Sequence, residues 1–401
     1  MSPTVVLPCD PASIVFPPNS HLPQISSPQT LASLKLASEH LLSLQCVVFP
    51  TETVYGLGAL ALNSSAASKI FTTKGRPPDN PLIVHISSSA MLRKILPADY
   101  ILPESYEILI RHFWPGPLTL LFPSDPLIIP KIITANQSTV AIRMPSHPVA
   151  RALIAVADTP IAAPSANSSG KPSPTKAEHV LRDLDGKVEL ILDGGASGVG
   201  LESTVVDGLN TDGIIRVLRP GGITVEEIER VIKSDMKKTD DKRIPDVLVH
   251  RRDYRDEAIE MAPTTPGMKY RHYSPSVPVI LLCTSSHPPD GTEPISASTF
   301  LGTLEAQSTS QSLKVGVLPL SDSPLATYPF PTQRIQWRIY PLGPTADPSA
   351  TAHRLFDGLL TLENEGMDFI LIEEVKEEQE GLAIMNRVRK AADETRWVRF
   401  D

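Results

Sequence analysis

Segments with hydrophobic residues at helical spacing alternate along the chain with short apolar runs that are typical of strands. Residues 29–45 place Leu34, Ala37 and Leu41 at helical spacing, and an apolar run at 46–49 follows them. Further short apolar runs predict strands at 81–86, 118–122, 139–143, 160–164, 189–193, 203–207 and 214–218. Helical spacing recurs at 64–73, 88–96, 105–113, 147–157, 175–184 and 224–233. Strands that alternate with helices in this way predict an α/β or α+β domain.

A second set of buried-strand patterns begins near Val277. Apolar runs lie at 277–282, 314–320 and 369–375, and helical patterns lie at 349–364 and 380–395. This order predicts a small parallel, Rossmann-like sheet. The stretch 284–311, between the first two of these apolar runs, is rich in Ser, Thr and Pro and is expected to be a loose loop.

Composition marks the boundaries between these regions. Residues 1–29 hold seven prolines and no basic residue, which predicts an extended arm with one short edge strand at 4–7. In 233–260, 16 of 28 residues are charged, which predicts a solvated insertion. Residues 262–276 are Pro-rich and aromatic, as in a tether with anchoring tyrosines. The predicted parts are an arm (1–28), a first α/β domain (29–232), an insertion and linker (233–276) and a C-terminal domain (277–401).

Charge and cysteine content narrow the functional class. The formal net charge is −8, and residues 1–232 carry 17 basic and 20 acidic side chains, a balance of −3. Such a chain is poorly suited to sequence-independent nucleic-acid binding, so we expect at most weak or indirect contact with RNA, tRNA included. No apolar run is long enough to span a membrane. Three widely separated cysteines and the absence of a targeting pattern favour the cytoplasm.

Two cations follow the predicted helix at 64–73. Lys74 and Arg76 flank a glycine, and Asn80 and His85 lie just downstream. Arginine can hold an anion as a fork and lysine as a point charge, so the pattern predicts an anion site. Lysine and arginine at a solvated helix C-terminus also interact favourably with the helix dipole, so a solvated helix end is the alternative interpretation of these residues.

Polar groups also gather at other strand ends. Residues 163–175 carry hydroxyl and amide side chains that could bind phosphate or simply cap the next helix. Arg143 and Arg219 end predicted strands, and a buried arginine requires an anionic partner from the protein or a ligand. The glycine-rich stretch 193–204 lacks the lysine of a P-loop, and no HExxH, GxSxG or zinc spacing occurs.

Taken together, these segments resemble one enzyme family. PTETVYGLG, KGRPPDNPLIVH, FWPGPLTLLF, VAIRMP, APSANSSGKPSPT, ESTVVD and LRPG, in this order, resemble the YrdC-type domain of L-threonylcarbamoyladenylate synthases. PGMKYRHYSP and LAIMNRVRKAA resemble the long, two-domain form. The likeness is dense over 29–232 and thinner over 262–401. It implies an α/β fold, in which a twisted YrdC-like domain is joined by an extended linker to a smaller Rossmann-like parallel domain.

The resemblance also implies a reaction and a set of site residues. The family converts L-threonine, bicarbonate and ATP into threonylcarbamoyl-AMP and pyrophosphate, and Mg²⁺ enters with the ATP. A partner complex then transfers the threonylcarbamoyl group to the adenosine beside the anticodon of tRNA. The implied L-threonine ligands are Thr53, His85, Arg143 and Ser203. The implied ATP ligands are Lys74, Arg76, Asn80, Thr139, Ser165, Asn167, Ser173, Arg219 and, from the tether, Tyr273 in preference to Tyr270. Lys74 and Arg76 would also stabilise charge during catalysis.

Other functions remain open from the residues alone. An RNA-binding module is the main alternative from another class, although no aromatic stacking motif supports it. An adenylating or carbamoyl-transferring enzyme that prefers another amine is a second alternative. For the C-terminal half, a purely regulatory role also remains.

Overall fold

The protein is described here from a computed structural model, which covers residues 3–18, 20–210, 212–236, 244–250, 252–254, 272–307, 312–331 and 334–400. The chain divides into two compact units, one of residues 1–169 and 173–270 and the other of residues 170–172 and 271–401. The predicted tether residue Tyr270 and most of 262–276 lie outside the described residues. Within the described residues, no helix is long and apolar enough to cross a membrane.

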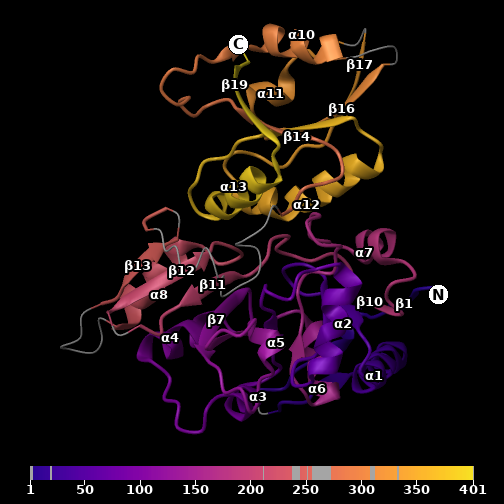
Figure 1. Cartoon of the computed structure of the whole chain (residues 1–401), viewed down its shortest axis with the longest axis vertical. Coiled ribbons are helices and arrows are strands. Elements are labelled where there is room, and N and C mark those ends of the chain that lie inside the picture. The colour runs from indigo at the N-terminus through magenta and orange to yellow at the C-terminus, as the bar shows by residue number, and fades with distance from the viewer. Residues whose placement is uncertain are drawn as a thin grey trace. The chain divides into compact units, whose positions relative to one another are not determined.

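The first unit contains a large mixed sheet with helices packed against it (Figure 1). Its elements are β1 (Val5–Pro8), η1 (Pro11–Ser13), β2 (Ile14–Val15), β3 (Gln24–Ile25), α1 (Pro28–Leu42), β4 (Val47–Phe49), β5 (Gly56–Leu60), α2 (Ser64–Lys74), β6 (Ile83–His85), α3 (Ser89–Ile95), α4 (Glu104–Phe113), β7 (Leu118–Pro123), α5 (Lys131–Thr134), β8 (Thr139–Arg143), α6 (Pro148–Ala157), β9 (Ile161–Ala162), α7 (Ala177–Leu184), β10 (Leu190–Asp193), β11 (Thr204–Asp207), β12 (Ile214–Arg219), α8 (Val225–Met236) and β13 (Asp246–Val249).

The sheet of this unit has the order β1-β10-β4-β5-β9-β6-β8-β7-β11-β12-β13. Parallel pairs such as β6 with β8 and β7 with β11 alternate with antiparallel pairs such as β7 with β8. The central strands are buried on both faces, which explains their continuous apolar sequences. Helices α1 and α6 pack together, as do α4 and α8 (Figure 1).

Local sequence signals explain the bounds of helix α2, which places the two predicted cations at its C-terminal end. Helix α2 begins after Asn63, whose side chain accepts a hydrogen bond from the Ala66 N–H. It ends at Gly75, which adopts a left-handed conformation with φ of 62°. Glycine reaches this region without a Cβ penalty, so it stops the helix directly after Lys74. Arg76 follows at the start of the loop that leads to β6.

Two expectations about the first unit need correction. The proline-rich arm contains more than one strand, because β2 and β3 form a small antiparallel hairpin behind the predicted edge strand β1. The charged stretch 233–260 is more than a solvated insertion, because β13 lies within it and pairs in parallel with β12. Since β13 is an edge strand, only part of its surface needs apolar residues, and its charged neighbours hid the strand pattern.

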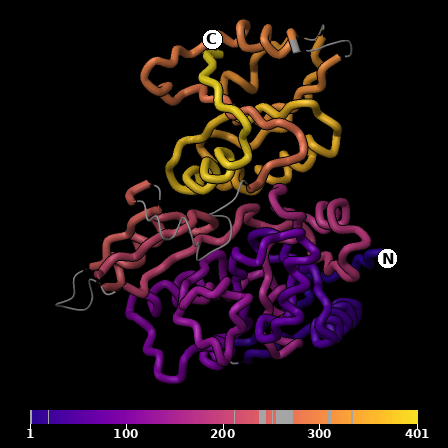
Figure 2. Tube along the Cα trace, viewed as in Figure 1, coloured from indigo at the N-terminus to yellow at the C-terminus, as the bar shows by residue number. Residues whose placement is uncertain are grey.

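The second unit is a parallel sheet with helices. Its order is β15-β19-β14-β18-β16-β17, and every neighbouring pair is parallel. Figure 2 traces this part of the chain from orange to yellow. The elements are β14 (Val279–Cys283), β15 (Ile295–Ser296), α10 (Ala297–Gln307), β16 (Leu313–Leu318), α11 (Pro324–Thr327), β17 (Ile335–Ile339), α12 (Pro348–Asn364), β18 (Phe369–Glu373), α13 (Glu380–Ala391) and β19 (Glu394–Arg399).

This sheet confirms the predicted Rossmann-like parallel arrangement, with local differences that include the unpredicted edge strand β17 (Ile335–Ile339). The expected loose loop at 284–311 holds β15 and α10, whose Phe300, Leu301 and Leu304 enter the core. The helix predicted over 380–395 ends at Ala391. The chain then forms β19, which pairs with both β14 and β15.

Candidate functional site

Two parallel strands bring together the first pair of predicted site residues. His85 ends β6 and Arg143 ends β8, and the two are direct register neighbours. Both side chains are buried. The His85 Nδ1 lies 3.1 Å from the Ile83 carbonyl oxygen. Because a carbonyl only accepts, Nδ1 carries a proton, which fixes the orientation of the ring.

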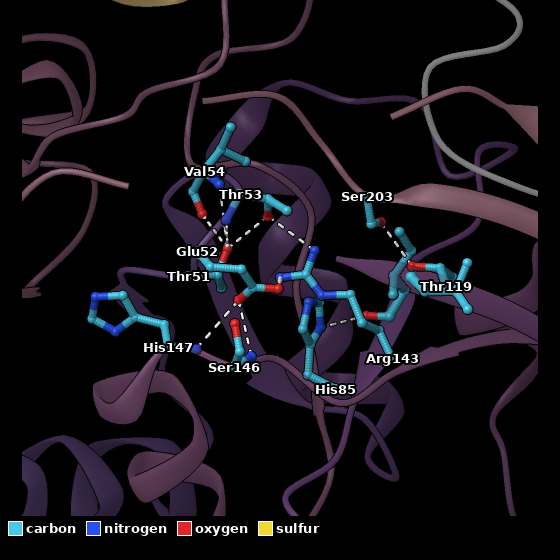
Figure 3. A network of polar contacts seen from close by, with 12 residues as sticks. Thr51, Glu52, Thr53, Val54, His85, Thr119, Arg143, Ser146, His147 and Ser203 are labelled. Atoms are coloured by element: carbon cyan, nitrogen blue, oxygen red, sulfur yellow. Dashed lines mark hydrogen bonds and ion pairs between the residues drawn. The ribbon is translucent and has the colours of Figure 1, made fainter. Parts of the chain in front are cut away.

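A tight polar turn between β4 and β5 meets Arg143 from the other side (Figure 3). Thr51 Oγ1 donates to the Val54 carbonyl at 2.6 Å and shares a 2.7 Å hydrogen bond with Thr53 Oγ1. Arg143 Nη1 donates to Thr53 Oγ1 at 2.9 Å. Glu52 lies opposite, with Oε1 3.5 Å from Arg143 Nη2. The turn therefore supplies both a hydroxyl and a carboxylate to one buried guanidinium.

Ser203 is held beside this cluster by residues from two neighbouring strands (Figure 3). Its hydroxyl shares a 2.7 Å hydrogen bond with Thr119 Oγ1 of β7. Arg219, which ends β12, donates from Nη2 to the Ser203 carbonyl at 2.8 Å and from Nε at 3.2 Å. Thr119 had no sequence signal, because it lies inside the apolar run of a buried strand.

Several of the predicted nucleotide residues form a second cluster around Lys74. Lys74 is 5% exposed, and its Nζ donates to the Ser165 carbonyl at 2.5 Å and to the Asn167 carbonyl. The same Nζ lies 3.5 Å from Asn167 Oδ1. Arg76 Nη2 donates to the carbonyls of Asn80 and Pro81 at 3.0 and 2.9 Å. The two cations thus order the loops that carry Ser165, Asn167 and Asn80.

A buried carboxylate connects the two clusters along the chain. Glu202 directly precedes Ser203, and its Oε1 accepts a 2.5 Å hydrogen bond from Ser173 Oγ. Sequence reasoning did not assign a role to Glu202 or to Glu52. Both stand beside assigned residues in polar segments at strand ends, so the same signal could have included them.

The remaining two predicted residues are Thr139, at the other end of β8, and Tyr273, in the second unit. Thr139 begins β8 and Arg143 ends it, so the two lie about 13 Å apart along the strand. Tyr273 belongs to the second unit, where its ring stacks on His272 at 4.3 Å and packs against Phe356 at 5.3 Å. Contact between Tyr273 and a nucleotide stays a prediction.

Burial controls the electrostatics of the site. It lowers the pKa of His85 to about 3, and the positive charge of Arg143 adds to this shift, so the imidazole is neutral. Burial likewise lowers the pKa of Lys74 well below its usual value, with a further contribution from Arg76. Burial lowers the pKa of Arg143, and Glu52 opposes that shift. No group of three or more metal-ligating side chains is found in the described part of the chain.

Family models match both units of the chain. A model described as "Telomere recombination" covers residues 40–221, and one described as "Threonylcarbamoyl-AMP synthase, C-terminal domain" covers residues 223–393. The second model begins inside the first unit, at residue 223, and continues through most of the second unit.

Similar proteins extend over most of the chain. A threonylcarbamoyl-AMP synthase of Schizosaccharomyces pombe is 44% identical over 367 residues, covering 86% of this chain and 84% of the relative. One of Pyrococcus abyssi is 42% identical over 359 residues, covering 90% and 94%. The crystal structure of P. abyssi Sua5 complexed with L-threonine superimposes with a TM-score of 0.75 at 37% identity, covering 98% of this chain and 100% of that one. The chain belongs to the threonylcarbamoyl-AMP synthase family, in the form that carries both domains.

Proposed function

We propose that this chain is an L-threonylcarbamoyladenylate synthase that uses L-threonine, bicarbonate and ATP and releases pyrophosphate. The observation that carries the proposal is the buried Arg143, which donates to Thr53 and lies beside the neutral His85, with Ser203 hydrogen-bonded to Thr119 in the same network (Figure 3). A buried guanidinium is a receptor for a carboxylate, and the surrounding hydroxyls suit the hydroxyl of threonine. The names of the relatives and the threonine complex of the P. abyssi protein support the same assignment.

The reaction needs positioning and charge neutralisation more than a protein nucleophile. The ammonium of threonine loses a proton, its nitrogen attacks the carbon of bicarbonate, and water leaves to give a carbamate. A carbamate oxygen then attacks the α-phosphorus of ATP, and the bond to the bridging oxygen of pyrophosphate breaks. Lys74, Arg76 and Arg219 would neutralise phosphate charge, and Ser165, Asn167, Ser173 and Asn80 would contact the nucleotide.

Two further features complete the proposal. Mg²⁺ would enter with ATP, because the phosphates and water can supply most of its oxygen ligands. Tyr273 would belong to a covering segment that protects the carbamate from hydrolysis. The product would pass to a complex that transfers the threonylcarbamoyl group to tRNA.

Product identification tests this assignment directly. The purified full-length protein is incubated with ATP, Mg²⁺, L-threonine and ¹³C-bicarbonate, and the nucleotides are separated and weighed by mass spectrometry. The proposal predicts threonylcarbamoyl-AMP whose mass is about one unit higher than that of the product made with unlabelled bicarbonate, because one ¹³C atom is incorporated. Formation of AMP or ADP alone, with no labelled adduct, would overturn it.

A further inference from the structure

Glu52 is the one acidic side chain that faces Arg143 within the network of Figure 3. Its two oxygens have different surroundings. Oε2 accepts hydrogen bonds from the backbone N–H groups of Ser146 at 3.1 Å and His147 at 3.4 Å. Oε1 lies 3.5 Å from Arg143 Nη2, in an ion pair whose atoms are too far apart for a good hydrogen bond.

This ion pair leaves polar atoms buried without hydrogen bonds. Glu52 Oε1, Arg143 Nε and Arg143 Nη2 are all inaccessible to water and have no hydrogen-bond partner. Buried polar groups are normally satisfied, and each exception requires a physical explanation. Here one acceptor and two donors remain unused within a few ångströms of each other, at the end of β8 where the predicted threonine residues meet.

The unused groups match the two charges of an α-amino acid. Its carboxylate can accept from Nε and Nη2 of a guanidinium, and its ammonium, attached one carbon away, can donate to a nearby carboxylate oxygen. We propose that Glu52 binds the α-ammonium group of L-threonine while Arg143 binds its carboxylate, so that the pair recognises the amino acid as a zwitterion. This inference rests on the proposed function, which supplies L-threonine as the substrate.

The exchange of partners is balanced in charge. Without substrate, Glu52 and Arg143 neutralise each other; with substrate, each is neutralised by one end of a molecule with no net charge. No buried charge is left unpaired in either state, which avoids the penalty of an isolated buried ion. If Arg143 bound the carboxylate alone, the substrate ammonium would lie unpaired close to a buried cation.

The neighbouring groups support this assignment. The two backbone N–H groups hold Oε2 and so fix the carboxylate with Oε1 directed toward Arg143. His85 and His147 are both kept toward their neutral forms by burial, so neither adds a cation beside the ammonium. Thr53 Oγ1 engages Nη1 of the guanidinium, which leaves Nε and Nη2 for the incoming carboxylate.

The test is a cycle that removes the two proposed partners one at a time. L-threonine is compared with 3-hydroxybutanoate, which lacks only the amino group, and the unmodified full-length protein is compared with Glu52→Gln. Binding is measured by titration calorimetry. Loss of a charged hydrogen bond predicts that Glu52→Gln weakens L-threonine about tenfold or more. The same substitution should leave 3-hydroxybutanoate unchanged or bind it more tightly, because an unpaired buried carboxylate is removed.

A purely structural role for Glu52 predicts a different pattern. If Glu52 only orients Arg143, the substitution weakens both ligands by the same factor, and that result overturns the inference. Glu107→Gln is the matched control, because Glu107 is exposed on α4 and should change neither affinity. Circular dichroism checks that each variant is folded.

The unmodified protein provides a second test that needs no variant. The inference predicts that it binds L-threonine at least about tenfold more tightly than 3-hydroxybutanoate. Equal affinities would overturn the inference even if Glu52→Gln failed to fold. Absence of L-threonine binding would overturn both this inference and the proposed function. Binding with the predicted pattern but without product formation would overturn the proposed function alone.

Discussion

His85 makes the stability of the first unit depend on pH in a way that can be calculated. The side chain is 3% exposed, packs edge-to-face against Phe49 and neighbours Arg143 in the sheet. These surroundings lower its pKa from 6.5 to about 3. An imidazolium would bring a second positive charge beside Arg143, and this repulsion adds to the cost of burying the protonated ring.

The sign and size of the effect follow from proton linkage. The unfolded chain takes up a proton at this histidine below pH 6.5, whereas the folded chain does so only near pH 3. Stability therefore falls as the pH decreases through that window. At about pH 4.5 the pH lies roughly two units below the pKa of the histidine in the unfolded chain, while the folded chain still holds the ring neutral. This corresponds to about 2–3 kcal/mol of lost unfolding free energy.

Urea unfolding of a matched pair measures this contribution. His85→Asn removes the titrating ring but keeps an amide that can donate to Ile83. Both members of the pair, the protein with His85 and the His85→Asn variant, also carry Trp337→Phe and Trp397→Phe. Trp114 is then the one tryptophan left of the three, so its fluorescence reports on the first unit.

Between about pH 7.5 and 4.5, the protein with His85 should lose about 2–3 kcal/mol more than the His85→Asn variant. His21→Asn, at an exposed position, should behave like the protein with His85. Equal pH dependence with and without His85 would refute the buried neutral imidazole.

Other substitutions test the anion site and the packing around it. Lys74→Ala or Arg76→Ala should each reduce turnover at least about tenfold, or about 1.4 kcal/mol of transition-state stabilisation, and near-normal rates would remove both from the proposed chemistry. Gly58→Ala should cost about 1–3 kcal/mol of unfolding free energy, because its Cβ would lie 2.5 Å from Phe49 Cε1. Gly302→Ala should stabilise α10 by about 0.5–1 kcal/mol, since the new Cβ meets nothing within 4 Å. Chemical unfolding in which Gly302→Ala lowers the unfolding free energy more than Gly58→Ala would contradict this description of the packing.

Much of the fold was predictable where local signals agreed with the global packing. Helix α2 has an Asn cap, an apolar stripe and a terminal glycine, and it was predicted to within one residue. Buried strands such as β7 and β8 carry continuous apolar runs that no surface element would tolerate. The parallel character of the second sheet followed from strands separated by helices.

The elements that were missed lack those signals. Strand β5 contains two glycines within GLGAL, and such small residues are typical of a loop, so no strand was predicted there. Strand β19 (ETRWVR) carries three charged residues, and Glu394 and Arg396 form an ion pair with each other, so the sequence lacks an apolar run. Only pairing with β14 and β15 makes this segment a strand, and such pairing is a property of the whole sheet.

The candidate site shows the same division. Reasoning from strand ends and from the family resemblance selected His85 and Arg143, and their register in the sheet places them side by side. It did not pair Arg143 with Glu52 or Ser203 with Thr119, because these partners come from segments that are distant in sequence. Residue types can be chosen locally, whereas the partner of a buried charge is decided by the tertiary fold.

Pyrophosphate release by the purified full-length chain tests the central claim most directly. ATP and Mg²⁺ are supplied with L-threonine and bicarbonate together, with each one alone, and with neither. Synthesis of threonylcarbamoyl-AMP predicts release only when both are present. Release that continues without L-threonine, or no release from protein that is shown to be folded, would contradict the assignment.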